Sequence, residues 1–178
     1  MVGAWAASKW MIPWADTVGG AAQPGYKALT QGYWALGAVL GSFFGAQLAG
    51  VLGRRLSYFL ISLGSTTLTS GLFLFTAPLR SAFLPTVLAQ GFVATLFFGW
   101  LPLYLPELFP TKVRATGSGI AYNTGRFATA GGVFAAGMLV VWFGGDIARV
   151  GAVMGLIYSL GMVAIWFAPE TSNRDLPD

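Results

Sequence analysis

A single arginine, Arg126, lies inside a long apolar stretch, where a cation could interact with a dissolved anion. No other charged residue occurs between Ala115 and Gly145. A charge at the centre of a membrane helix costs at least ~2.5 kcal/mol on insertion scales, so it usually faces a cavity or a partner. Tyr122 and Asn123 precede Arg126 by four and three residues, which places them on nearly the same helix face. This spacing predicts a polar site that binds or steers a solute, and the charge favours an anion.

Other interpretations of these polar residues stay open. Arg126 could pair with a carboxylate or carbonyl of a partner bundle, or extend to the cytoplasmic interface about three helical turns away. Gln47 and Gln90 also lie within apolar runs. Each could line a water-filled path, or each could make an interhelical hydrogen bond worth less than ~2 kcal/mol.

Other kinds of chemistry find no support in the sequence. Cysteine and histidine are both absent, which excludes disulfides and sites built from these side chains. No nucleophile elbow or phosphate-binding loop occurs, and we expect neither an enzyme nor a metal or other cofactor. Coupling to protons or to sodium ions stays open. The net charge is +4, but the ten basic residues are scattered, so we expect no nucleic-acid partner.

The amino-acid composition indicates whether this chain folds in water or in a lipid bilayer. Of 178 residues, 56% are hydrophobic and 9% are charged, and the mean hydropathy is +0.68. A soluble domain has about 25% charged residues. The composition therefore excludes an ordinary soluble domain and predicts an all-α membrane protein in contact with a lipid bilayer.

Charge-free runs divide the chain into membrane spans, each of which needs about 20 apolar residues. Lys9 and Pro13 interrupt the first run, so it predicts a truncated first helix. We expect residues 1–178 to form a single transmembrane bundle of six helices, with spans at about 1–15 (partial), 30–53, 56–77, 83–106, 114–143 and 149–168, followed by a cytoplasmic tail at 169–178.

The basic residues between the spans predict the orientation, because cytoplasmic loops are enriched in lysine and arginine. One side would carry Arg54, Arg55, Lys112, Arg114 and Arg174. The other side would carry only Lys27, Arg80 and Arg149. We therefore expect a multi-pass protein of the cell (inner or plasma) membrane with a cytoplasmic C-terminus.

Small residues recur at four-residue spacing in several predicted spans. Gly37, Gly41 and Gly45 lie on one face of the span 30–53, and Gly125 belongs to a similar series in the span 114–143. Such seams let helix backbones approach closely in lipid. They would also permit the sliding of helices that transport requires.

Three short motifs carry a resemblance to a known family. Residues 104–114 read YLPELFPTKVR, residues 48–55 read LAGVLGRR and residues 168–171 read APET. Their order and their positions between spans resemble major facilitator superfamily transporters, closest to sugar porters and organic-acid symporters. The chain resembles the C-terminal six-helix half of that twelve-helix fold. Gly50 and Val51 depart from the family's loop motif, which has Asp and Arg at these positions.

The resemblance implies secondary active transport of a small polar solute, a sugar or a small organic acid, by alternating access. The partner would be the missing N-terminal six-helix half or a second copy of the chain. The resemblance also implies a cytoplasmic gate of ion pairs formed by Glu107, Arg114, Arg54, Arg55 and Glu170. Alternatively, these charges could form a solvated interfacial cluster worth little energy.

A second function class is also compatible with the sequence. The chain could be a truncated or non-transporting six-span membrane protein that acts as a scaffold or as a self-associating half-carrier.

Overall fold

Long helices account for the apolar runs, because a backbone in lipid must satisfy its own hydrogen bonds. The computed structural model describes residues 3–172, and within that range it contains helices and no strand. The long helices are α2 (Tyr26–Leu52), α3 (Arg54–Phe75), α4 (Phe83–Glu107) and α5 (Arg114–Trp142). The last span, Ile147–Phe167, is divided into α6 (Ile147–Gly155), α7 (Ile157–Ala164) and the 3₁₀ turn η3 (Ile165–Phe167).

Five helical stretches in the described range are long and apolar enough to cross a membrane, so the prediction of an all-α membrane fold is confirmed. The N-terminal segment is shorter and consists of the π-helical turn η1 (Gly3–Ala7), the 3₁₀ turn η2 (Ser8–Trp10) and α1 (Met11–Gly19). It continues four residues beyond the predicted end at 15, because the chain meets no helix-breaking residue before Gly19 and Gly20. Similarly, α2 begins at Tyr26 rather than at 30. Residues 173–178 of the predicted tail, including Arg174, lie outside the described residues.

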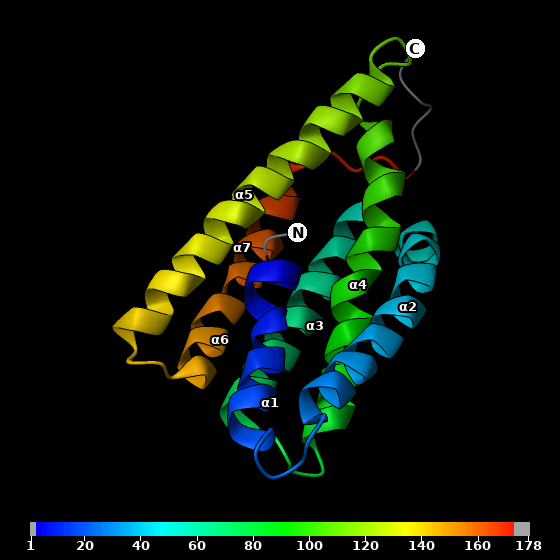
Figure 1. Ribbon diagram of the computed structural model, residues 1–178. Helices are drawn as coiled ribbons and strands as arrows, with labels where there is room; N and C mark the ends of the chain where they lie inside the picture. The colour runs from blue at the N-terminus through cyan, green and yellow to red at the C-terminus, as the bar shows by residue number, and fades with distance from the viewer. Residues whose placement is uncertain (1–2, 173–178) are drawn as a thin grey trace.

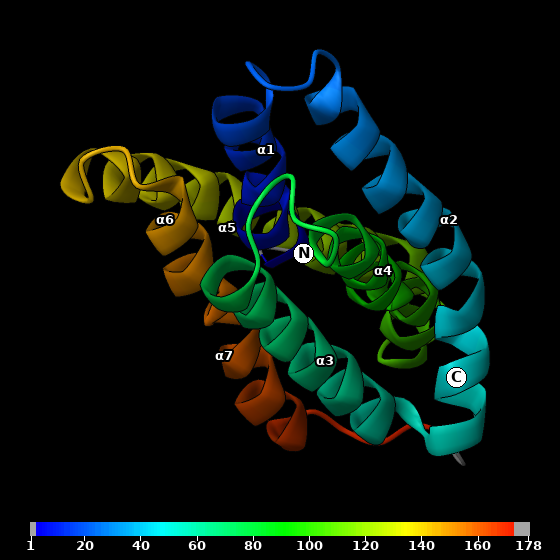
Figure 2. The same cartoon turned by 90° about the horizontal axis from the view of Figure 1, so that it is seen from below.

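Helix α4 occupies the centre of the bundle, with α2 and α3 on either side of it (Figure 2). The N-terminal segment lies beside α6 and against α5, and it begins about halfway along the bundle (Figure 1). Helix α5 is the least covered of the long helices, since Ala136 is its only buried residue. Part of the surface of α5 thus faces the N-terminal segment, and polar side chains of these two elements can approach each other there.

The contact between α2 and α4 depends on glycine. Gly37, Gly41 and Gly45 are buried, and a Cβ atom at these positions would collide with the backbone carbonyl oxygens of Leu88, Phe92 and Leu96 of α4. A Cβ atom at Gly91 or Gly99 of α4 would likewise collide with backbone carbonyl oxygens of α2, those of Trp34 and Ser42. The glycine seam thus brings the two backbones into direct contact, as small residues do in membrane bundles.

A methyl group in this seam is expected to separate the helices. Gly45→Ala should destabilise the bundle by ~1–3 kcal/mol, the usual cost of overpacking, because the obstructing atom is a backbone oxygen that cannot rotate away. Gly50→Ala in the same helix is the matched control, since nothing lies within 4 Å of its added methyl group. Melting temperatures of the two variants in detergent measure the difference, and equal values would contradict the role of the seam.

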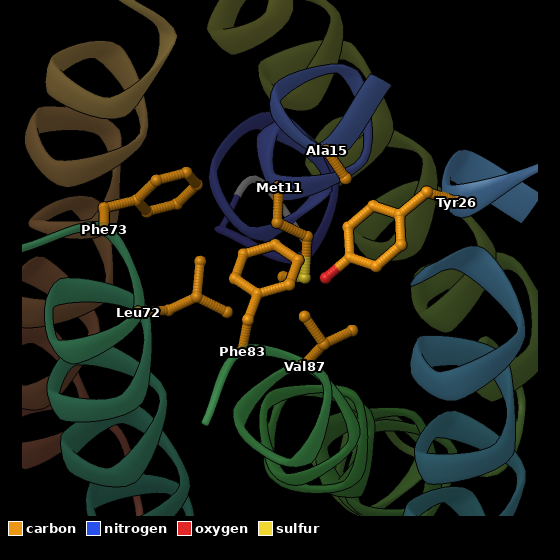
Figure 3. Close-up of a cluster of buried hydrophobic side chains, with 7 residues drawn as sticks. All are labelled: Met11, Ala15, Tyr26, Leu72, Phe73, Phe83 and Val87. Atoms are coloured by element: carbon orange, nitrogen blue, oxygen red, sulfur yellow. The ribbon is translucent and has the colours of Figure 1, made fainter. Parts of the chain in front are cut away.

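An apolar cluster fixes the N-terminal segment to the bundle. Met11 and Ala15 of α1 pack between Tyr26 of α2, the end of α3 and the start of α4, and the full set of buried residues is Met11, Ala15, Tyr26, Leu72, Phe73, Phe83 and Val87 (Figure 3). Trp14 adds ring contacts to Phe73 and Phe83 at centroid distances of 5.4 and 5.7 Å. This packing holds the residues just before α1, including Lys9, at a defined place beside α5.

Candidate solute groove and charged cluster

Charged residues from three distant segments meet where α2 ends and α3 begins. Arg54 Nη2 and Nε donate hydrogen bonds to the two carboxylate oxygens of Glu107, at 2.5 and 3.0 Å. Both side chains are largely buried, with 11% and 12% of their surface exposed. Thr171 donates its hydroxyl to Glu107 Oε2 at 2.5 Å, and Arg55 Nε donates to the carbonyl of Ala168 at 2.6 Å. We call Arg54, Arg55, Glu107, Glu170 and Thr171 the Arg54 cluster.

Glu170 serves as a cap for α3. Gly53 precedes this helix and has no side chain, so the carboxylate of Glu170 accepts the backbone N–H groups of Arg54 and Arg55, each at 2.9 Å. A negative charge at this end of a helix is favourable because the N–H groups and the helix dipole both point at it. Burial by itself raises the pKa of Glu170, but the N–H donors of Arg55, Arg54 and Ser172 outweigh it and hold the pKa at about 2.

This depressed pKa predicts a pH-dependent anchor for the C-terminal segment. An unfolded glutamate titrates near pH ~4.3, so the carboxylate of Glu170 stabilises the fold fully above that pH. Its contribution disappears as the pH falls toward the folded pKa of about 2. The melting temperature of the wild-type protein should therefore exceed that of Glu170→Gln by a constant margin above about pH 5, and the margin should shrink between pH 4 and 2. A margin independent of pH would refute the capping role.

Two aromatic residues and one arginine complete this end of α4. Trp100 donates its indole N–H to the carbonyl of Arg54 at 2.9 Å, and Tyr104 donates its hydroxyl to the carbonyl of Pro169 at 2.7 Å. Arg114 Nε donates to the carbonyls of Pro106 and Phe109, at 3.1 and 3.2 Å, at the end of α4. The five predicted gate residues thus gather at one end of the bundle, and the Arg54 cluster connects helices within this bundle.

Arg126 opens on a groove between α5, α4 and the N-terminal segment. The groove encloses about 440 Å³ and is lined by Trp5, Phe98, Tyr122, Arg126, Thr129, Ala130 and Val133. Arg126 is exposed, and one face of α5 supplies it together with Tyr122 and Thr129. We call this hollow the Arg126 groove. It combines a cation and two hydroxyl groups with aromatic walls, a combination suited to a small anion with an apolar part.

The other polar residues predicted from the sequence lie outside this groove. Asn123 is exposed and donates its amide to the carbonyl of Gly119 on its own helix at 2.9 Å. Gln47 is exposed on α2. Gln90 is fully buried in α4 and donates to the hydroxyl of Thr69 in α3 at 2.7 Å. Of the two interpretations of Gln90, the structure therefore shows the interhelical hydrogen bond and not a place on an open path.

The small-residue series of α5 is half-buried in the structure. Gly125 is half-buried, and the only fully buried residue of this helix is Ala136. A Cβ atom at Gly117 would meet the ring of Phe109 in the preceding loop rather than another helix. Gly117 therefore packs against a loop residue, and the packing role of Gly125 stays a prediction.

Sequence reasoning missed several of the residues that complete these sites. Thr129 could have been identified from the sequence, because it follows Arg126 by three residues and shares its helix face. Trp5 and Phe98 could not have been identified in this way, since they reach the groove from elements far away in the sequence. Among residues 3–172, no group of three His, Cys, Asp or Glu residues could hold a metal ion.

The family model and the relatives that match this chain all describe transporters. The family model described as sugar (and other) transporter matches residues 17–178. The chain is 38% identical over 110 residues to a probable 4-methylmuconolactone transporter of Cupriavidus pinatubonensis (strain JMP 134 / LMG 1197), covering 58% of this chain and 25% of that protein. It is 31% identical over 117 residues to the cis,cis-muconate transport protein of Acinetobacter baylyi (strain ATCC 33305 / BD413 / ADP1), covering 66% of this chain and 27% of that protein.

The matches cover about a quarter of the length of these two curated relatives. No solved structure matches the chain. The family match extends over most of the chain, and both relatives are named as transporters rather than enzymes. The chain therefore belongs to the sugar (and other) transporter family, within the major facilitator superfamily that its motifs resemble.

Proposed function

We propose that this chain is the C-terminal part of a secondary carrier that moves a small organic anion across the cell membrane. The observation that carries the proposal is the exposed guanidinium of Arg126 near the middle of α5, in a groove with aromatic walls. A sugar would need many neutral hydrogen-bonding groups, whereas this groove offers a cation. The name of the second relative supports an organic acid as substrate, since muconate is a small dicarboxylate.

Alternating access is the transport mechanism that we propose, with the Arg54 cluster as the gate. The cluster joins α3, α4 and the segment after η3 at the end of the bundle that the basic residues predict to be cytoplasmic. Partly desolvated charge pairs of this kind are stronger than pairs in water. Their formation would favour one state of the carrier, and their opening would allow the helices to separate at this end.

A second six-helix bundle is the partner that we propose, either an N-terminal half or a second copy of the chain. The exposed apolar side chains of α5 support it, among them Phe127, of which 80% is exposed, and the chain matches only a quarter of its relatives' length. Cross-linking of the complete gene product in mild detergent distinguishes the two arrangements. A dimeric product indicates a second copy, and a monomeric product counts against it.

Uptake of labelled cis,cis-muconate by vesicles containing the complete gene product tests the proposed function. We expect saturable uptake that increases with an imposed proton or sodium gradient and is absent from empty vesicles. Glucose should not compete. Absence of uptake of any carboxylate, or competition by glucose alone, would overturn the proposal.

A further inference from the structure

Lys9 is a second cation at membrane depth, and the sites described above do not use it. Its ammonium group lies 3.6 Å from the centroid of the Trp34 ring and 5.3 Å from that of the Trp5 ring. Contacts of a cation with aromatic faces are attractive and directional. The two tryptophans therefore hold this ammonium group in one place while leaving its N–H donors available to an anion.

The depth of Lys9 follows from the helix geometry. Lys9 precedes the end of α1 at Gly19 by ten residues, about 15 Å along a helix axis. Trp34, which it contacts, lies eight residues into α2, about 12 Å from the same end of the bundle. The hydrocarbon core is about 30 Å thick, so both estimates place Lys9 near its middle. An ionisable residue at this depth indicates a functional site with a partner that remains to be named.

The hollow beside Lys9 adjoins the Arg126 groove. It encloses about 160 Å³ and is lined by Trp5, Lys9, Trp10, Pro13 and Val133. Trp5 and Val133 also line the Arg126 groove, so the two hollows share these walls. Val133 follows Arg126 by two turns of α5, about 10 Å along its axis. The two cations thus open on adjoining hollows, with the Trp5 ring at the boundary between them.

No carboxylate of the described chain neutralises either cation. The four carboxylates between residues 3 and 172 all have other partners: Asp16 pairs with Lys27, Glu107 with Arg54, Asp146 with Arg149, and Glu170 caps α3. Two cations near the middle of a membrane, both without an ion pair in this part of the molecule, require negative charge from elsewhere. A solute that carries two negative charges can supply it to both.

We propose, building on the function proposed above, that Lys9 is the second anchor of the solute path and that the substrate class is a flat, unsaturated dicarboxylate. One carboxylate binds Arg126 and the other binds the Lys9 ammonium group. The carbon chain between them lies along the Trp5 ring, where a flat conjugated chain makes the largest apolar contact. A monocarboxylate of the same carbon skeleton can bind only one of the two cations, so Lys9 determines the preference for dianions.

Uptake of muconate and of 2,4-hexadienoate, its six-carbon monocarboxylate analogue, by vesicles containing the complete gene product tests this proposal. The readout is the ratio of kcat/KM for the two anions. We expect the wild-type ratio to favour muconate, Lys9→Gln to lower it about tenfold or more, and Lys9→Arg to restore most of it. Lys27→Gln is the matched control, because Lys27 at the start of α2 forms an exposed ion pair with Asp16 of α1, and it should keep the wild-type ratio.

A purely structural role for Lys9 would reduce uptake of both anions together, so an unchanged ratio in Lys9→Gln overturns the proposal. Uptake of neither anion by the wild-type protein also overturns this proposal, whereas the proposed function itself is overturned only if no carboxylate is taken up. If Lys9→Gln does not accumulate, protection of the wild-type protein from amine acetylation replaces the variant. Muconate should protect Lys9 more than 2,4-hexadienoate does, while Lys27 and Lys112 serve as internal references. Equal protection of Lys9 by the two anions would also overturn the proposal.

Discussion

Glu107→Gln is expected to lower the stability of the bundle by ~3 kcal/mol, at the lower end of the range for breaking a buried ion pair. The neutral amide would leave the Arg54 guanidinium largely buried without its counter-charge. It would also weaken the hydrogen bond from Thr171, which ties the C-terminal segment to α4. The melting temperature of the complete gene product in detergent measures the loss, and uptake should fall as well if the Arg54 cluster acts as the gate.

The exposed pair between Asp16 and Lys27 provides the control for this prediction. These side chains are 46% and 56% exposed, so Asp16→Asn should cost less than ~1 kcal/mol. In a double-mutant cycle, Arg54→Gln combined with Glu107→Gln should cost clearly less than the sum of the single changes, because the second change removes the charge that the first leaves unpaired. Additive losses, or equal losses in Glu107→Gln and Asp16→Asn, would show that the pair contributes little.

Arg126→Gln is expected to reduce carboxylate uptake by about 10- to 100-fold, which corresponds to the ~1.5–3 kcal/mol of a hydrogen bond to a charged group. The loss should appear mainly as a higher KM, because the guanidinium is proposed to bind the anion rather than to support the fold. Arg126 is exposed in its groove, so the variant should accumulate and melt like the wild-type protein. Uptake kinetics in vesicles and melting temperature in detergent separate the two effects.

Arg149→Gln is the matched control for Arg126. Arg149 lies near the start of α6, with 72% of its side chain exposed and with Asp146 as its ion-pair partner. Its replacement removes the same charge from the protein but not from the groove, so uptake should stay within about twofold of the wild-type value. Wild-type uptake kinetics in Arg126→Gln would remove Arg126 from the solute path. Equal losses in both variants would point to a general effect of net charge.

The long helices followed from the sequence because lipid leaves the backbone few alternatives. An apolar run of sufficient length must be helical, and charged residues with proline or glycine must end it. The predicted span 83–106 therefore differs from the structural α4 by one residue, and 114–143 differs from α5 by one residue at its end. Neither run length nor charge in the sequence predicted the break in the last span between Gly155 and Ile157. Gly151 and Gly155 there contact Phe73 and Thr69 of α3, and that contact depends on packing rather than on hydropathy.

The charged residues show what a family pattern can supply. Arg54 and Glu107 are 53 residues apart in the sequence, and nothing in their spacing indicates a contact. The motifs around them predicted a common place at one end of the bundle, and the structure brings them into hydrogen-bond contact. The capping of α3 by Glu170 had no signal in the sequence, because the acceptor and the N–H groups come from segments more than 110 residues apart.

By itself, the sequence determined the lipid environment, the helical fold class, the family and the presence of a cation, Arg126, at membrane depth. These properties follow from composition, run length and short motifs, which are local. Only the tertiary structure decided that Gln90 is a buried hydrogen-bond donor, that Asn123 lies outside the groove, and that Lys9 and Arg126 open on adjoining hollows. The physical reason is that burial and proximity depend on which helix faces meet, and in this chain the close approach of backbones at the glycine seam and the packing of α1 set those faces.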